Sequence, residues 1–118
     1  MSTHQSDIRI RIRLDDQRIP EQIEWEASDA SQSVPSESKS VFLALLDKET
    51  LDTSTLFLWT KECQVAEMDR QLFYALSAWA DGYYKATQHT ALANEMRRFV
   101  QYFGEKTGII PPEDGPTP

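Results

Sequence analysis

The chain has 118 residues, of which 40% are hydrophobic and 26% are charged, as is typical of one small globular domain. Its formal net charge is -7, and both halves of the chain carry more acidic than basic residues. This balance argues against binding to nucleic acid or to anionic membrane surfaces, because both are negatively charged.

The first predicted element is a strand over residues 8–14, where isoleucine or leucine alternates strictly with arginine. Residues 15–20 have turn composition, and residues 22–27 alternate again and predict a second strand. If the two strands form an antiparallel hairpin, their charged side chains share the solvent-facing side and pair across the strands. These side chains are Arg9, Arg11 and Arg13 on the first strand and Glu24 and Glu26 on the second.

Residues 28–40 are rich in serine and predict a solvated connection. The apolar run 41–46 is compatible with a strand or with a helix over 36–47, because a short apolar run does not distinguish the two. We favour a strand, since 47–52 resembles a connector to the next strand. That strand covers 53–60, which is rich in β-forming residues.

From Val65 onward the apolar residues repeat with the period of a helix. A first stripe contains Met68, Leu72, Ala75, Leu76, Trp79 and Tyr83. Residues 87–90 interrupt it, and a second stripe contains Leu92, Met96, Phe99 and Phe103. Lys106, Gly108, Pro111 and Pro112 are the stop signals expected at a helix C-terminus.

These elements predict an α+β fold, with a four-stranded antiparallel sheet followed by two C-terminal helices. We expect a single domain over residues 7–110, with a disordered N-terminus at 1–6 and a disordered tail at 111–118.

No arrangement of residues predicts catalysis, a metal site or a cofactor. His4 and His89 have no cysteine or carboxylate at metal-ligand spacing, and the glycines form no phosphate-binding motif. Cys63 has no neighbouring base in the sequence, so an enzyme that uses its thiol is a weaker hypothesis than a binding protein. We therefore expect a protein that is not an enzyme.

Localisation is predicted to be cytoplasmic. No apolar run approaches the length of a membrane-spanning helix, and the N-terminus lacks the pattern of a signal peptide. A single cysteine is typical of a reducing compartment.

The fourth predicted strand has large apolar residues on both faces: Phe57 and Trp59 on one, Leu56 and Leu58 on the other. Two helices can cover one face of a four-stranded sheet but not both. Phe57 and Trp59 are therefore either hidden inside the monomer or part of an interface. We expect a homo-oligomer, a dimer or larger, which associates through the sheet or its edge strands. Tyr84 and Tyr102 lie off the main helical stripes and are further candidates for protein contacts.

Several short motifs resemble those of the gliding-motility protein C (GldC) family of gliding bacteria. They are Leu58-Trp59-Thr60-Lys61, Val65, Glu67-Met68, Ala80-Asp81, Ala86-Thr87 and Tyr102-Phe103-Gly104-Glu105-Lys106. The resemblance runs from about Ile8 to Pro112. It implies a cytoplasmic accessory protein of the motility machinery and brings no catalytic residues. Lys61, within the first motif, joins the candidates for protein contacts.

The order of strands and helices also resembles that of the export chaperone SecB, without motif support. Proteins of that kind assemble through their sheets and bind unfolded clients in apolar grooves. Two hypotheses therefore stand: an adaptor that binds a folded partner of the motility or export machinery, and a chaperone that holds unfolded polypeptide.

Overall fold

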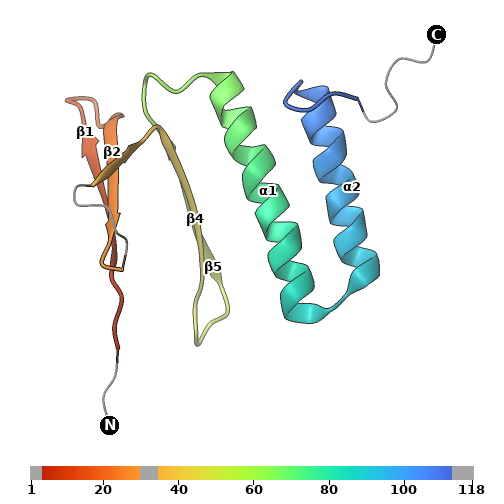
Figure 1. The fold of residues 1–118 in the computed structure, drawn as a ribbon. Coiled ribbons are helices and arrows are strands. Elements are labelled where there is room, and N and C mark those ends of the chain that lie inside the picture. The colour runs from red at the N-terminus through yellow and green to blue at the C-terminus, as the bar shows by residue number, and fades with distance from the viewer. Residues whose placement is uncertain (1–3, 30–34, 113–118) are drawn as a thin grey trace. The chain divides into compact units, whose positions relative to one another are not determined.

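The computed structural model describes residues 4–29 and 35–112 (Figure 1). By its contacts the chain forms two compact units, Met1–Cys63 and Gln64–Pro118, which we call the strand unit and the helical unit. The single domain over 7–110 stays a prediction. The disorder expected at both ends concerns in part residues 1–3 and 113–118, which lie outside the described residues.

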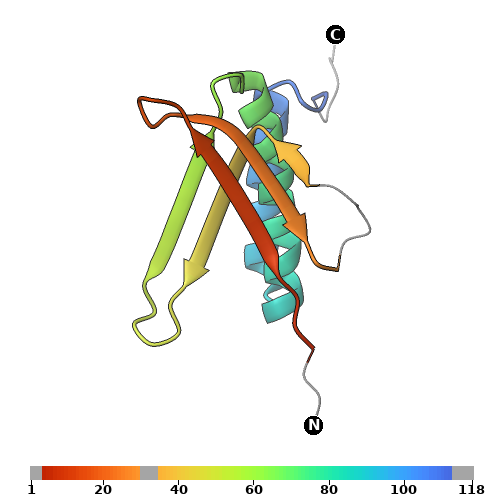
Figure 2. The same ribbon diagram turned by 90° about the vertical axis from the view of Figure 1, so that its left-hand side faces the viewer.

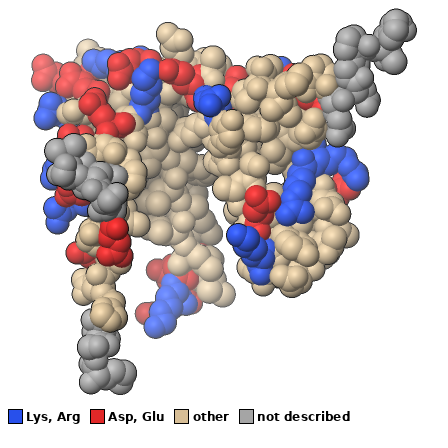
Figure 3. Space-filling view, viewed as in Figure 1, with Lys and Arg blue, Asp and Glu red and all other residues tan. Residues whose placement is uncertain are grey.

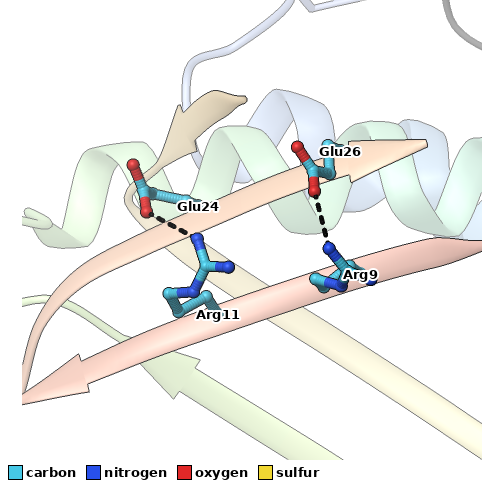
Figure 4. Close-up of polar contacts among 4 residues, drawn as sticks. All are labelled: Arg9, Arg11, Glu24 and Glu26. Atoms are coloured by element: carbon cyan, nitrogen blue, oxygen red, sulfur yellow. Dashed lines mark hydrogen bonds and ion pairs between the residues drawn. The ribbon is translucent and has the colours of Figure 1, made fainter. Parts of the chain in front are cut away.

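The first hairpin of the strand unit has the predicted pairing. β1 (Ile8–Leu14) runs antiparallel to β2 (Pro20–Ala27). Arg9 lies opposite Glu26 and Arg11 opposite Glu24, with Nη1 3.2 Å and 3.5 Å from the facing Oε1 (Figure 4). Arg13 lies opposite Gln22. The charged side chains are solvent-facing, so the predicted hairpin is confirmed.

The prediction of one four-stranded sheet is wrong. A short strand, β3 (Ser36–Ser38), pairs with β2 and completes a three-stranded sheet in the order β1-β2-β3. β4 (Ser40–Leu46) and β5 (Thr53–Trp59) form a separate two-stranded sheet. The chain bends at Lys39 and passes there from one sheet into the other, so that β3 lies beside β2 while β4 pairs only with β5 among the described strands. Figure 2 shows the strands of the two sheets crossing.

The interior of the strand unit is small. Ile23 in the middle of β2 is 1% exposed, and Thr60 just beyond β5 is 2% exposed. The backbone nitrogen of Thr60 donates to the carbonyl oxygen of Lys39 at 2.8 Å, and its hydroxyl donates to the same oxygen at 3.3 Å. Thr60 therefore fixes the end of β5 to the bend between the two sheets.

The helical unit contains two antiparallel helices, α1 (Val65–Thr87) and α2 (Thr90–Lys106), as the sequence predicts (Figure 1). Gln88, with φ 59°, ends α1 in the left-handed conformation, and Gly108, with φ 79°, follows the end of α2. Within the described residues, neither helix is long and apolar enough to span a bilayer.

Candidate protein-interaction surfaces

The contact between the two helices combines small side chains with a few large ones. Ala80 of α1 and Ala93 of α2 are fully buried, and Val100 and Gly104 of α2 are also buried. A Cβ atom at Gly104 would lie only 2.6 Å from Cε1 of Phe73 on α1. Arg97 joins the contact from the side, with its guanidinium 5.4 Å from the ring centre of Tyr84. The facing positions are therefore 73, 80 and 84 on α1 and 93, 97, 100 and 104 on α2.

Successive residues of a helix are rotated by about 100°, so each facing position has neighbours on opposite sides of the helix pair. Because the helices run antiparallel, the residues that precede the facing positions lie on one side of the pair, for both helices. The residues that follow the facing positions lie on the other side. Asp81 follows Ala80 and bonds across the helices to Arg97, 3.2 Å from Oδ1 to Nη2.

The preceding positions form what we call the apolar helical face. Its members are Leu72, Trp79, Tyr83, Leu92, Met96, Phe99 and Phe103. Trp79 is 68% exposed and Phe99 is 52% exposed, and Phe99 has its ring centre 6.2 Å from that of Phe103. The apolar stripes predicted from the sequence therefore exist, but they lie beside the contact between the helices and not within it.

The following positions form the polar helical face: Tyr74, Asp81, Lys85, Asn94, Arg98, Gln101 and Glu105. Gln101 Nε2 donates to Glu105 Oε2 at 2.6 Å, and Arg98 pairs with Glu95 at 2.5 Å. The helix pair is thus amphipathic as a unit, and no strand or helix among residues 64–112 covers its apolar face.

The β4–β5 hairpin provides a second exposed apolar surface. Opposite residues of an antiparallel pair point to the same face, so Phe42 and Phe57 share one face with Trp59. Their ring centres lie 5.2 Å apart for Phe42 and Phe57 and 5.4 Å apart for Phe57 and Trp59. Trp59 is 47% exposed, and Phe42 and Phe57 are also exposed. We call these three residues the aromatic face of the hairpin.

The opposite side of the hairpin is aliphatic. It consists of Val41, Leu43, Leu45, Leu56 and Leu58, which the register places together. Leu43, Leu45 and Leu56 are exposed. Figure 3 shows the hairpin as an uncharged surface, with charged side chains gathered at its loop end. A two-stranded sheet with apolar residues exposed on both faces is unusual for an isolated monomer.

Lys61 is engaged in a contact within the strand unit. Its Nζ lies 2.5 Å from Oδ2 of Asp15 in the turn between β1 and β2. The other oxygen of Asp15 accepts hydrogen bonds from the backbone nitrogens of Gln17 and Ile19. The bond from Lys61, followed by that from Ile19, lowers the pKa of Asp15, and the bond to Asp15 raises the pKa of Lys61. Lys61 therefore anchors the turn to the end of β5.

Tyr84 and Tyr102 occupy different environments. Tyr84 is half-buried at a facing position, covered by Arg97, and belongs to the contact between the helices. Tyr102 is exposed, with its ring centre 6.3 Å from that of Phe99 and Nζ of Lys106 5.7 Å from its ring centre. Tyr102 thus extends the apolar helical face.

His89 and Cys63, which the sequence analysis weighed as metal-ligand or catalytic residues, take part in local hydrogen bonds of the fold. His89 is the N-cap of α2, and its Nδ1 accepts a hydrogen bond from the backbone nitrogen of Leu92 at 3.4 Å. Cys63 is half-buried, and its backbone nitrogen donates to the carbonyl oxygen of Thr60. Among the described residues, no group of three or more histidine, cysteine or acidic side chains is placed to hold a metal ion.

Three exposed aromatic residues of these two apolar surfaces were missing from the sequence-based candidates: Phe42, Trp79 and Phe99. Phe42 could have been found by pairing the strands on either side of the connector 47–52 as a hairpin, because that pairing places Phe42 opposite Phe57. Trp79 and Phe99 were assigned to stripes of the kind that usually face a core. The signal against that assignment is the small residues that follow some stripe members: Ala80 follows Trp79 on α1, and Ala93 and Gly104 follow Leu92 and Phe103 on α2.

The chain was compared with known protein families, curated proteins and solved structures. A family model described as "Gliding motility-associated protein GldC-like" matches residues 20–109, from the start of β2 to just beyond α2. No curated protein and no solved structure matches the chain.

Proposed function

Since the chain belongs to the GldC-like family of gliding motility-associated proteins, we propose that it is a non-enzymatic accessory protein of the cytoplasm that acts by binding other proteins of the gliding machinery. The family match confirms the resemblance seen in the sequence. The family is defined by its association with gliding motility and is not a known enzyme family.

The observation that carries this proposal is the apolar helical face. Trp79, Leu92 and Phe99 are exposed there, on a helix pair whose opposite side is polar. Exposed apolar surface of this extent is typical of protein–protein contacts, and tryptophan is the residue most enriched among their energetic anchors. The net charge of -7 favours a partner with basic residues around its own apolar patch.

A test uses a strain of the native host from which the gene has been deleted. We expect the wild-type gene to restore gliding, and a Trp79→Ser/Phe99→Ser variant to fail although the protein accumulates normally. The matched control is a Lys85→Ser/Arg98→Ser variant on the polar helical face, which should restore gliding. Full gliding with both variants would contradict the proposed surface, and unimpaired gliding in the deletion strain would contradict the proposed function.

A SecB-like chaperone is the second candidate, and the β4–β5 hairpin is the feature that favours it. Apolar side chains on both faces, and outer strand edges that no other described strand covers, suit the binding of extended polypeptide. The purified protein, mixed with a reduced and denatured model protein, separates the two functions. A chaperone keeps the denatured protein soluble at stoichiometric ratios, whereas an adaptor for a folded partner leaves its aggregation unchanged.

A further inference from the structure

The outer edge of β4 carries a regular row of backbone hydrogen-bonding groups. At the ends of the hairpin, the nitrogen of Asp47 donates to the oxygen of Asp52 and that of Thr60 to the oxygen of Lys39. Hydrogen-bonded and non-hydrogen-bonded pairs alternate in an antiparallel ladder. The backbone groups of Ser40, Phe42, Ala44 and Leu46 therefore point away from β5, and no described strand pairs with them.

This edge lacks the features that normally prevent pairing with another chain. Ser40–Leu46 contains no charged residue, no proline and no glycine, and its apolar side chains are exposed on both faces. Proteins usually protect such edges with charges, prolines or bulges. β1, at the edge of the other sheet, has three arginines on its outer face.

We propose that β4 pairs antiparallel with β4 of a second copy of this chain, about a two-fold axis at Leu43, so that two hairpins form one four-stranded sheet. The strand order is then β5-β4-β4-β5, and the interface is isologous. This inference concerns self-association and does not rest on the proposed role in motility.

We choose a second copy of the chain as the partner because the β4 edge is complementary to itself in this register. Residues whose numbers sum to 86 lie opposite each other, so Phe42 lies beside Ala44 of the second copy, a large residue beside a small one. Ser40 lies beside Leu46, and the outward backbone groups of both strands pair along their whole length. Beyond the strand ends, Lys39 lies beside Asp47 of the second copy, which gives two symmetry-related contacts between opposite charges.

The same register joins the aliphatic faces of the two hairpins. Leu43 meets Leu43 of the second copy at the axis, and Val41 lies beside Leu45 on each side of it. These side chains then form one uninterrupted apolar surface across four strands. Three or more strands with an apolar face are far more stable than an isolated hairpin.

Disulfide trapping of the full-length protein tests the register. In a Cys63→Ser background, Leu43→Cys places two cysteines at a non-hydrogen-bonded pair, where Cα atoms lie about 4.5 Å apart, within the range of a disulfide. We expect most of the Leu43→Cys protein to form a covalent dimer under mild oxidation. Leu56→Cys is the matched control, because Leu56 lies opposite Leu43 on β5. Its two copies would be about 14 Å apart, three strand spacings, and should not react.

Leu56 is also the central residue of β5, so the control reports on the competing arrangement. If the β5 edges pair instead, Leu56→Cys forms the covalent dimer and Leu43→Cys does not, which overturns the proposal. Failure of both variants to react, with a monomeric wild-type protein at about 50 μM, overturns it as well.

Proline substitution gives a second test by sedimentation velocity. Ala44→Pro removes a backbone donor that points away from β5, so it leaves the ladder within the hairpin intact and blocks pairing at the β4 edge. Thr55→Pro removes the equivalent donor at the β5 edge, because Thr55 lies opposite Ala44. We expect Ala44→Pro to be monomeric and Thr55→Pro to remain dimeric, with unchanged circular dichroism for both. A dimeric Ala44→Pro variant contradicts the proposal.

Discussion

Of the three glycines that the structure describes, Gly104 has the tightest surroundings. A Cβ atom there would lie 2.6 Å from Cε1 of Phe73 and 2.8 Å from Cγ1 of Ile110. We expect Gly104→Ala to lower the free energy of unfolding by about 1–3 kcal/mol, the usual effect of overpacking. Gly82→Ala is the control, because nothing lies within 4 Å of its Cβ position and alanine favours the helix by about 1 kcal/mol. Urea unfolding measures both variants, and equal effects would contradict the close packing at Gly104.

The ion pair between Asp15 and Lys61 predicts how the stability of the strand unit depends on pH. The pKa of Asp15 is lowered from 3.8 in the folded protein. Its stabilising contribution is therefore complete above that value and is lost as the pH falls through the lower folded pKa. The pKa of Lys61 is raised from 10.5. Its contribution is complete below 10.5 and is lost as the pH rises through the higher folded pKa.

Replacing Lys61 tests both directions at once. We expect Lys61→Met to reduce the loss of stability below pH 4 and above pH 10, and to lower the stability near neutral pH. Lys48→Met, in the loop of the other hairpin, is a control that removes the same charge. Urea unfolding from pH 2 to pH 11 measures these profiles, and identical profiles for Lys61→Met and the wild type would contradict the role of the ion pair.

At the scale of the element, α2 begins at a histidine, which is a weak N-cap. Nδ1 of His89 accepts one long hydrogen bond, 3.4 Å from the backbone nitrogen of Leu92. Aspartate is among the best N-cap residues, and its charge interacts favourably with the helix N-terminus. We expect His89→Asp to raise the free energy of unfolding by about 0.5–1 kcal/mol and His89→Ala to lower it. Urea unfolding gives both values, and the reverse order would show that His89 does not act as a cap.

The strands and helices themselves were predictable from the sequence. Alternation over residues 8–14 and 22–27 gave the first hairpin with its charge pairs, because a period of two fixes which side chains share a face. The helix ends followed from Gly108 and the interruption at 87–90. β3 was missed because three residues within a serine-rich connection carry no periodic signal.

How the elements combine was less predictable. Both long apolar stripes of the helices were recognised, yet the helices meet through Ala80, Ala93 and Gly104. Small residues allow two helices to pack closely. A pattern of hydrophobic residues, however, does not show that such small residues, and not Trp79 or Phe99, form the contact between the helices. The division into two sheets depends on a bend at Lys39, which no residue type in that segment requires. The sequence therefore predicted some of the residues of the candidate surfaces, but it did not predict which residues lie together on one surface.

At the scale of the whole molecule, stability and binding are expected to depend on different residues. Ile23 is 1% exposed, so Ile23→Ala should lower the free energy of unfolding by about 2–5 kcal/mol. Trp79→Ser and Phe99→Ser should each change it by only about 0.5 kcal/mol, because both side chains are exposed. Thermal and urea unfolding of the three variants measure this contrast. A large loss of stability in Trp79→Ser would mean that the apolar helical face is covered within the monomer.

Site-specific photo-crosslinking in the native host tests most directly whether the apolar helical face is a binding surface. A photoreactive amino acid replaces Trp79 or Phe99 on that face, and Tyr74 or Lys85 on the polar helical face of the same helix pair. We predict that irradiation joins the first two variants to a protein required for gliding, and that the last two variants give no such product. Equal crosslinking from both faces, or crosslinking only from the polar helical face, would show that the apolar helical face is not the binding surface.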